Sequence, residues 1–341
     1  MLSLKALKLL VYINNSTPLL VCGRIIVMKK IIPVILFILF SLNAYAGDGF
    51  KKSGFFYMNE NNGRIKYSKE FEVKLPKDKI ILIWNHGQEY TDKKSKDCVW
   101  YDEMVNLTAL IKDHKVLGKE MLLYVFCSDH LQGDSYKKNW EEKKKLIPYK
   151  GKTKMDKRVE AIVKLTDDFA SLGIPRNQIF LMGNSCGAWA NLLIVSQFSE
   201  KVAGGIEFMP ACYGWVSKNG IEKQTEYVPG FMPLRQKGIN IIKNAKKLPV
   251  LVFTNPDDIF EGKTSYWLKE IEELQFIETP SKEKKGYFIN KKKCMVIGKD
   301  WKDPLRKMKY PGHTIWSADC FQFYNSVILE YIEKRIKYGN N

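Results

Sequence analysis

The feature that most constrains the fold is the alternation of short, continuously apolar runs with amphipathic segments. The runs and strand-like segments are 55–67, 71–75, 80–84, 121–127, 179–182, 202–209, 249–254 and 294–297. Segments with helical spacing lie between or after them, at 101–113, 156–172, 188–198, 265–274 and 321–336. A continuous apolar run is expected for a strand buried on both faces. The sequence therefore predicts a single-domain, mostly parallel, doubly wound α/β sheet with helices on both faces.

Two stretches interrupt this alternation. Residues 211–248 carry several aromatic side chains, and residues 275–293 are basic and loop-like. Because long insertions in compact domains commonly carry function, 211–248 is predicted to form a cap-like insertion beside a pocket. The alternative is a surface excursion without a role.

The first 46 residues are predicted to be a leader outside the fold. From Met28, two lysines precede an apolar stretch over 31–42, and Ala44-Tyr45-Ala46 follows. These are the three regions of a secretory signal peptide, here 28–46, while 1–27 is interpreted as an upstream over-extension of the start site. An uncleaved anchor is the alternative. We therefore expect a mature domain over 47–341 that is exported to a periplasm or secreted.

Cysteine usage agrees with export. Of the seven cysteines, six lie beyond the leader: Cys98, Cys127, Cys186, Cys212, Cys294 and Cys320. An even number permits up to three disulfides in an oxidising compartment. Because no pattern has the spacing of zinc ligands, no metal site is expected.

The chain is basic, with 55 Lys and Arg against 37 Asp and Glu, a net charge of +18. A nucleic-acid partner is the first interpretation of such a charge. However, the lysines are spread along the chain with acids between them, so no nucleic-acid partner is expected. A weak association with anionic envelope surfaces remains open. The sequence gives no indication of oligomeric state.

The main chemical motif is Gly183-Asn184-Ser185-Cys186-Gly187. It follows a predicted buried strand and opens a predicted helix, a setting in which the serine occupies a sharp, exposed turn. Gly183 and Gly187 are expected because side chains there would collide at the tight turn. Ser185 is the candidate nucleophile, and the alternative is a glycine-rich turn without chemistry.

A serine hydroxyl needs a base, and the base needs an orienting carboxylate. Of the four histidines, only His313 lies C-terminal to Ser185, in a loop before the last helix. The strand 249–254 runs into Asp257 and Asp258. Asp258 is the preferred acid and Asp257 the alternative.

An oxyanion hole requires two backbone N–H donors. Cys186, next to the nucleophile, is predicted to supply one. The loop after the strand 80–84 would supply the other through Gln88, with Gly87 as the alternative. His86 is interpreted as structural.

With these residues the chain resembles the α/β-hydrolase superfamily, and within it the dienelactone-hydrolase-like and esterase/peptidase group. His86-Gly87, the Gly183–Gly187 motif, Asp258 and Gly312-His313 carry the resemblance. It implies a Ser185–Asp258–His313 triad and an acyl-enzyme mechanism. One departure matters, because dienelactone hydrolases proper use a cysteine where Ser185 stands.

Disulfide pairings are expected between cysteines that flank neighbouring elements. Cys212 ends the strand that is predicted to lie beside the sharp turn of the Gly183–Gly187 motif. A disulfide between Cys186 and Cys212 would therefore stabilise the site. Cys98–Cys127 and Cys294–Cys320 are the further candidates, and buried free thiols are the alternative.

The predicted function is therefore that of an exported serine hydrolase cleaving a small carboxylic ester, without metal or organic cofactor. A serine peptidase, an acyltransferase and a non-catalytic ligand-binding module on the same fold are the alternatives. Several aromatic residues would line an acyl pocket or belong to the core: Trp189, Tyr213, Trp215, Phe260 and Trp316.

Overall fold

The computed structural model describes residues 53–58, 65–68, 73–87, 98, 101–128, 131, 152–215, 226–227, 232–256, 258, 260–279, 288–289, 292–293, 312–313 and 319–339. All of them belong to one compact unit, Asp48–Asn341. The predicted leader lies outside the described residues and remains a prediction.

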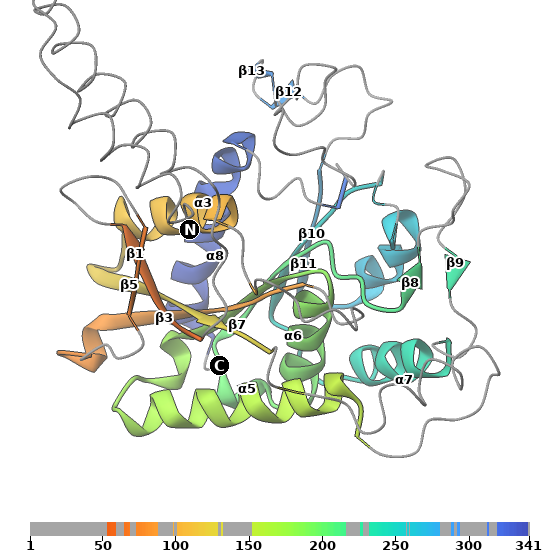
Figure 1. Ribbon diagram of the computed structural model, residues 1–341, viewed down its shortest axis with the longest axis horizontal. Helices are drawn as coiled ribbons and strands as arrows, with labels where there is room; N and C mark the ends of the chain where they lie inside the picture. The colour runs from red at the N-terminus through yellow and green to blue at the C-terminus, as the bar shows by residue number, and fades with distance from the viewer. Residues whose placement is uncertain are drawn as a thin grey trace, which may run out of the picture. The chain divides into compact units, whose positions relative to one another are not determined.

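A nine-stranded sheet forms the centre of this unit (Figure 1). Its order is β11-β10-β7-β6-β3-β5-β1-β2, with β4 paired to β5. The parallel strands are β3 (Lys79–Asn85), β5 (Lys119–Phe126), β6 (Ile179–Asn184), β7 (Gly204–Phe208), β10 (Val250–Thr254) and β11 (Leu274–Glu278). The antiparallel strands are β1 (Gly54–Met58), β2 (Ile65–Ser68) and β4 (Lys115–Val116). The predicted doubly wound, mostly parallel sheet is thus confirmed.

Helices cover both faces of the sheet (Figure 1). Their bounds are α3 (Tyr101–Lys112), α5 (Lys154–Ser171), α6 (Cys186–Gln197), α7 (Met232–Lys243) and α8 (Asn325–Tyr338). Side chains alternate along the strands, so Ile80, Leu82 and Trp84 of β3 pack in one core with α3 and α8. Ile81 and Ile83 pack in a second core with α5, α6 and α7. The continuous apolar run in β3 therefore serves two separate cores.

The longest described helix, α5, begins two residues before the predicted segment 156–172. Its N-cap is Thr153, whose hydroxyl accepts from the backbone N–H of Asp156 at 3.0 Å. The Asp156 carboxylate in turn accepts from the backbone N–H of Thr153 at 2.8 Å. Asp156, the first residue of the predicted segment 156–172 and itself a residue type that can cap a helix, instead lies inside the first turn and completes a capping box. The predicted end is correct, since Gly173 follows with a φ of 93°.

The C-terminal half of the sheet differs from the prediction. In place of a helix over 265–274 there is a 3-10 helix, Gly262–Glu270, and a turn in which Glu273 adopts a φ of 66°. The stretch 275–293, predicted as loop, begins with the strand β11, which pairs with β10. As an edge strand it is only half-buried, so its apolar pattern is weak.

Smaller differences lie at the ends of elements. Residues 73–75 are not a strand, because Leu75 with a φ of 52° leads into the 3-10 helix Pro76–Asp78. The last helix begins at Asn325, after a 3-10 segment, Asp319–Tyr324. Short two-stranded ribbons pair β8 (Gly214–Trp215) with β9 (Glu226–Tyr227) and β12 (Phe288–Ile289) with β13 (Lys292–Lys293). The strand predicted over 294–297 lies outside the described residues.

Within 211–248 the described part contains α7, which packs on α6. A Cβ at Gly238 would lie 3.0 Å from the indole of Trp189, so glycine allows close contact between these helices. Residues 216–225 and 228–231 are not described, so the predicted cap remains a prediction.

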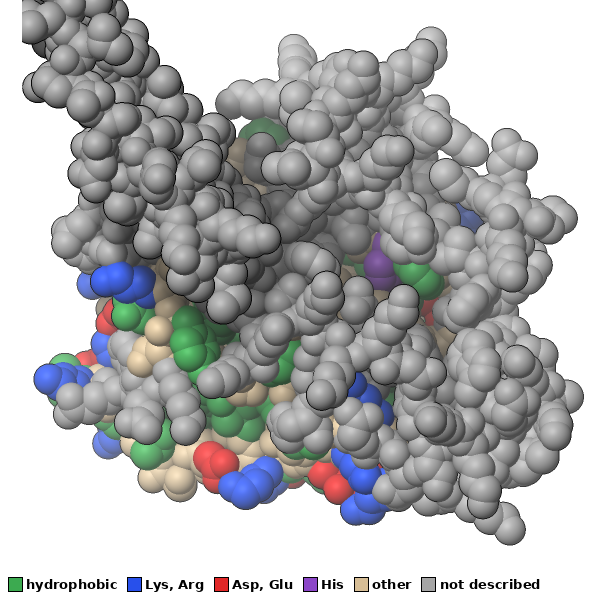
Figure 2. Space-filling model, viewed as in Figure 1, with side chains coloured by type: hydrophobic (Ala, Val, Ile, Leu, Met, Phe, Trp, Pro, Cys, Tyr) green, Lys and Arg blue, Asp and Glu red, His purple; other side chains and the backbone are tan. Residues whose placement is uncertain are grey.

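Charged side chains of both signs lie side by side along the α5 face (Figure 2). Lys164 pairs with Asp168 at 2.8 Å and Lys152 with Glu160 at 2.6 Å. None of the helices in the described ranges combines the length and apolar character needed to cross a bilayer.

Candidate active site

Ser185 occupies a strained turn between β6 and α6. Its φ of 53° and ψ of −126° are unfavourable for a residue with a Cβ. Three backbone hydrogen bonds hold it there. Its N–H donates to Phe208 at 3.1 Å, and its carbonyl accepts from Trp189 at 3.0 Å and from Ala211 at 3.2 Å. The turn raises Ser185 at the carboxyl end of the sheet, as the motif predicts.

The two glycines of the motif allow close packing behind this turn. A Cβ at Gly187 would lie 2.0 Å from the carbonyl oxygen of Asn85. A Cβ at Gly183 would lie 2.8 Å from the Asn191 amide nitrogen and 2.9 Å from the backbone nitrogen of Ala188. Any larger residue would therefore displace the strand β3 or the first turn of α6.

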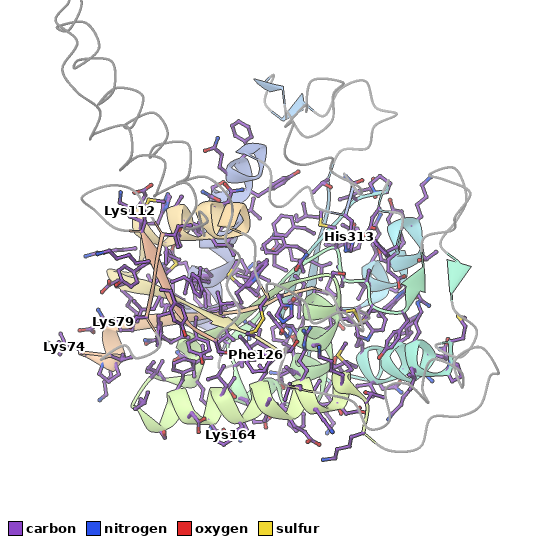
Figure 3. The ribbon with its side chains drawn as sticks, in the orientation of Figure 1. Lys74, Lys79, Lys112, Phe126, Lys164 and His313 are labelled. Carbon is purple, nitrogen blue, oxygen red and sulfur yellow. A yellow bond between two sulfur atoms is a disulfide. The ribbon has the colours of Figure 1, made fainter. Side chains whose placement is uncertain are left out.

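Asp258 and His313 lie in contact beyond the end of β10. His313 Nδ1 donates to Asp258 Oδ2 at 2.9 Å, and both side chains are buried. The other carboxylate oxygen accepts from the backbone N–H of Phe260 at 2.9 Å. The Phe260 ring lies 4.5 Å from the imidazole, centroid to centroid. Figure 3 labels His313 at this position beside β10. Asp257, the alternative acid, lies outside the described residues.

The Ser185 hydroxyl donates to the backbone carbonyl of Ala211 at 3.1 Å. Within the described part of the chain no hydrogen bond joins it to His313. In this structure Ser185 and the Asp258–His313 pair therefore form two separate hydrogen-bonded units.

Of the two candidate oxyanion donors in the loop after β3, the structure describes Gly87 and not Gln88. Gly87 lies against Ser185, because a Cβ there would be 3.0 Å from Ser185 Cβ. Its N–H already donates to Asn184 Oδ1 at 2.8 Å, so the alternative donor is engaged elsewhere. Gln88 lies outside the described residues. Cys186 begins α6 immediately after Ser185.

Two disulfides are present, and both match predicted pairings. Cys186–Cys212 joins the first turn of α6 to the segment after β7, and Cys98–Cys127 joins a residue after β3 to the end of β5. Cys186 therefore carries no free thiol. For Cys294–Cys320, the side chains are not described. Disulfides indicate folding in an oxidising compartment.

A buried polar network starts from Asn85, the last residue of β3. Its amide donates to Asn191 Oδ1 at 3.2 Å and to the carbonyl of Gly187 at 3.3 Å. Asn191 donates to Glu207 Oε2 at 3.0 Å. Complete burial raises the pKa of Glu207 well above its ordinary value and so favours the protonated, uncharged carboxyl group. We call Asn85, Asn191 and Glu207 the acid network.

A second buried network starts from His86, the next residue. The imidazole bonds to Gly87 and Ser128, and Arg158 of α5 donates to both the His86 carbonyl and the Ser128 hydroxyl. Burial, and then the nearby Arg158 charge, hold the pKa of His86 well below its ordinary value. His86 is therefore a neutral, buried side chain, in line with its predicted structural role. We call His86, Ser128 and Arg158 the guanidinium network.

Sequence reasoning missed both networks, although a signal for each was present. Glu207 is a lone acid within a buried strand, and Arg158 falls on the apolar stripe of α5 that includes Ile162 and Phe169. A charged residue at a core position indicates a specific polar partner.

The described residues contain one His/Cys group close enough to bind a metal: His86, Cys98 and Cys127. The two sulfurs are joined in a disulfide, and both imidazole nitrogens are hydrogen-bonded. This group therefore offers no free ligand atom.

Two of the candidate pocket aromatics belong to the core. Trp189 packs edge-on against Tyr213 and Trp267, at 5.8 and 6.4 Å between ring centroids, and both Trp189 and Tyr213 are buried. Phe260 instead lies beside His313. The side chain of Trp215 and the whole of Trp316 lie outside the described residues.

Three features define the architecture: the order of strands in the sheet, the strained turn at Ser185 after β6, and the position of Asp258 after β10. The chain has the α/β-hydrolase fold. No protein-family model matches the sequence, and no curated protein matches it significantly.

Solved structures of esterases are similar at low identity. A thermostable esterase matches with a TM-score of 0.42 and 14% identity, over 82% of this chain and 62% of its own length. A phospholipase/carboxylesterase from Dyadobacter fermentans has a TM-score of 0.34 and 17% identity, over 59% and 80% of the two chains. An esterase from Rhizomucor miehei has a TM-score of 0.44 and 12% identity, over 97% and 96%. At these values the likeness says nothing about what this chain acts on.

Proposed function

We propose that this protein is an exported serine hydrolase that cleaves small carboxylic esters through an acyl-enzyme on Ser185. The proposal rests on one observation. The same fold holds Ser185 in a strained turn between β6 and α6 and also holds a buried hydrogen bond between His313 and Asp258.

In the proposed acylation step, the Ser185 hydroxyl leaves Ala211 and turns towards His313. Nε2 of His313 takes the hydroxyl proton as Ser185 Oγ attacks the ester carbonyl. Asp258 holds Nδ1–H, which leaves Nε2 free to act as the base and stabilises the imidazolium that forms. His313 then gives the proton to the leaving alcohol, and the acyl group stays on Ser185.

The developing oxyanion is stabilised by two backbone N–H donors. We assign one to Cys186 and the other to Gln88, since the N–H of Gly87 is already used by Asn184. In deacylation His313 activates water, which attacks the acyl-enzyme and releases the acid. The residues that carry these steps require no metal or organic cofactor.

Export is proposed on two grounds: the signal-peptide pattern over 28–46 and the two disulfides. The substrate would then be met in a periplasm or outside the cell. The distributed positive charge favours a weak association with anionic envelope surfaces and no nucleic-acid partner.

Turnover of p-nitrophenyl acetate and butyrate, beside aminoacyl arylamides, tests the proposal. Wild-type protein is expected to hydrolyse the esters, and Ser185→Ala to lose at least about 10³-fold in kcat. Ser196→Ala is the matched control, because Ser196 lies in α6, the helix that follows Ser185, and its hydroxyl donates to the carbonyl of Leu192. Preference for the arylamides would favour a peptidase, and binding without turnover of either class would overturn the hydrolase assignment.

A further inference from the structure

A short segment after β7, residues 209–212, lies against Ser185, and we call it the β7 turn. The paired part of β6 and β7 ends just before Ser185 and Met209, so both residues begin turns at neighbouring strand ends. Ala211 then contacts Ser185 twice. Its N–H donates to the Ser185 carbonyl at 3.2 Å, and its carbonyl accepts from the Ser185 hydroxyl at 3.1 Å. One residue of the β7 turn therefore binds both the backbone and the hydroxyl of Ser185.

The β7 turn is itself strained. Met209 is buried and has a φ of 44°, in a region that residues with a Cβ rarely adopt. Its N–H still donates to the carbonyl of Phe253 on β10 at 2.8 Å, while Pro210 has no N–H to contribute. Backbone strain of this kind persists only where the surrounding contacts over-determine it. Ser185 and Met209 are two strained residues side by side, so the contacts between their turns have to offset the strain of both.

A covalent bond is one of these contacts. The disulfide Cys186–Cys212 joins the residue after Ser185 to the residue after Ala211, and both cysteines are buried. The hydrogen-bonded pair and the covalently bonded pair are therefore consecutive in both segments. Hydrogen bonds can open transiently, whereas the disulfide limits how far the β7 turn can move away from Ser185.

We propose that the β7 turn, held in place by the Cys186–Cys212 disulfide, positions the nucleophile. Met209, Ala211 and Cys212 are then positioning residues that act through the backbone of residues 185 and 186. The inference rests on the proposed function, in which Ser185 attacks the ester and the N–H of Cys186 stabilises the oxyanion. Without the disulfide the β7 turn can withdraw, and the Ser185 backbone relaxes towards a less strained conformation. The hydroxyl and the Cys186 N–H then lose the geometry that they share.

The second disulfide of the chain supplies a matched control. Cys186–Cys212 and Cys98–Cys127 span 26 and 29 residues, so loop-closure entropy predicts nearly equal losses of stability when either is removed. The variants are Cys186→Ala/Cys212→Ala and Cys98→Ala/Cys127→Ala. Alanine keeps the backbone N–H of residue 186, so the first variant retains that oxyanion donor.

Both double variants should lower the midpoint of denaturant unfolding by similar amounts. Only Cys186→Ala/Cys212→Ala should also lower kcat and kcat/KM for p-nitrophenyl acetate, by about 10- to 100-fold, as expected when a reacting group is misplaced by about 1 Å. A trifluoromethyl ketone places an oxyanion beside residue 186 when it adds to Ser185, so its inhibition constant should rise in parallel. A disulfide that only stabilises the fold would change the unfolding midpoint and neither of these quantities.

The wild-type protein provides a second measurement, which does not require a variant to fold. Dithiothreitol reduces a disulfide to two thiols and is itself oxidised to a cyclic disulfide. Alkylation followed by mass spectrometry gives the time course of reduction at each cysteine. Esterase activity should fall as the thiols of Cys186 and Cys212 appear, independently of those of Cys98 and Cys127, and should return on reoxidation.

The proposal is overturned if folded Cys186→Ala/Cys212→Ala keeps wild-type kcat and ketone affinity, or if wild-type protein stays fully active after Cys186 and Cys212 are reduced. Equal losses of kcat in the two double variants would also overturn it, because the effect would then follow stability alone. A wild-type protein that is inert towards both esters and fluorophosphonate would instead overturn the proposed function, and this inference with it.

Discussion

Two consecutive residues at the end of β3 begin two different buried networks. Asn85 leads to Asn191 and to Glu207, a carboxyl group whose pKa burial raises, while His86 leads to Ser128 and a charged Arg158. The acid network binds the carbonyl of Gly187, which follows Ser185 in the chain, and the guanidinium network binds the carbonyl of Gly87, which lies against Ser185. The same strand end thus supports Ser185 from two directions.

The difference lies in charge. A neutral carboxyl group acts only through its shape and hydrogen bonds, so an amide can replace it. A guanidinium supplies several donors in a fixed plane, which no other side chain reproduces. Tolerance to substitution should therefore differ sharply between the two networks.

The largest effect is expected for Arg158→Met. It leaves the His86 carbonyl and the Ser128 hydroxyl without their charged donor, and should lower the free energy of unfolding by about 3 kcal/mol. Arg158→Lys keeps the charge but cannot make both hydrogen bonds of the guanidinium. Its free energy of unfolding should therefore lie between those of Arg158→Met and the wild-type protein. Denaturant unfolding measures both.

Arg176→Met provides the comparison for Arg158. Arg176 pairs with Asp167 on the surface, with more than a third of its side chain exposed. Its loss should cost less than about 1 kcal/mol. If both substitutions lower the free energy of unfolding by the same amount, the buried guanidinium network adds no more stability than a surface ion pair.

A smaller effect is expected in the acid network. Glu207→Leu leaves the buried amide of Asn191 without an acceptor and should cost about 2 kcal/mol, with a fall in kcat as the first turn of α6 loosens. Glu207→Gln keeps the acceptor and the neutral state, and should stay within about 1 kcal/mol of wild type. Exposed Glu160, changed to Leu, is the control. If Gln proves as damaging as Leu, the carboxyl group is not neutral.

The smallest effect, counted per pH unit, is a difference in pH dependence. The pKa of Glu207 is raised in the folded state, so its contribution to stability is complete below about pH 4.5 and declines as the pH rises towards the folded pKa. The pKa of His86 is lowered, so its contribution is complete above about pH 6.5 and declines as the pH falls. Each slope is at most about 1.4 kcal/mol per pH unit.

Unfolding free energies measured from pH 4 to pH 9 separate the two slopes. Glu207→Gln should remove the loss on the alkaline side, and His86→Asn the loss on the acid side. A variant that keeps the wild-type slope on its own side would show that its group titrates normally in the folded protein.

Local patterns predicted the elements around Ser185 well. The apolar run of β3, the glycines of the elbow and the position of His313 after the last sheet strand all follow from short-range rules. Asp258 could be chosen over Asp257 only as a preference, because one residue of loop geometry separates them. The structure shows Asp258 in contact with His313.

Features that depend on distant contacts could not be predicted. Glu207 and Arg158 are ordinary charged residues until the fold buries them beside Asn191 and Ser128, more than ten residues away in each case. The edge strand β11 was missed because its half-buried pattern resembles a loop. The start of α5 at Thr153 lies before the predicted segment 156–172, because Asp156 is also a residue type that can cap a helix.

The most direct test of the account is to locate the residue that a fluorophosphonate modifies. Wild-type protein treated with the probe should carry one phosphonyl group, found by mass spectrometry on the peptide that contains Ser185. Ser185→Ala should remain unlabelled, and Ser196→Ala should label as wild type does. A folded protein that stays unlabelled, or carries its label on another residue, would contradict the assignment of Ser185 as the nucleophile.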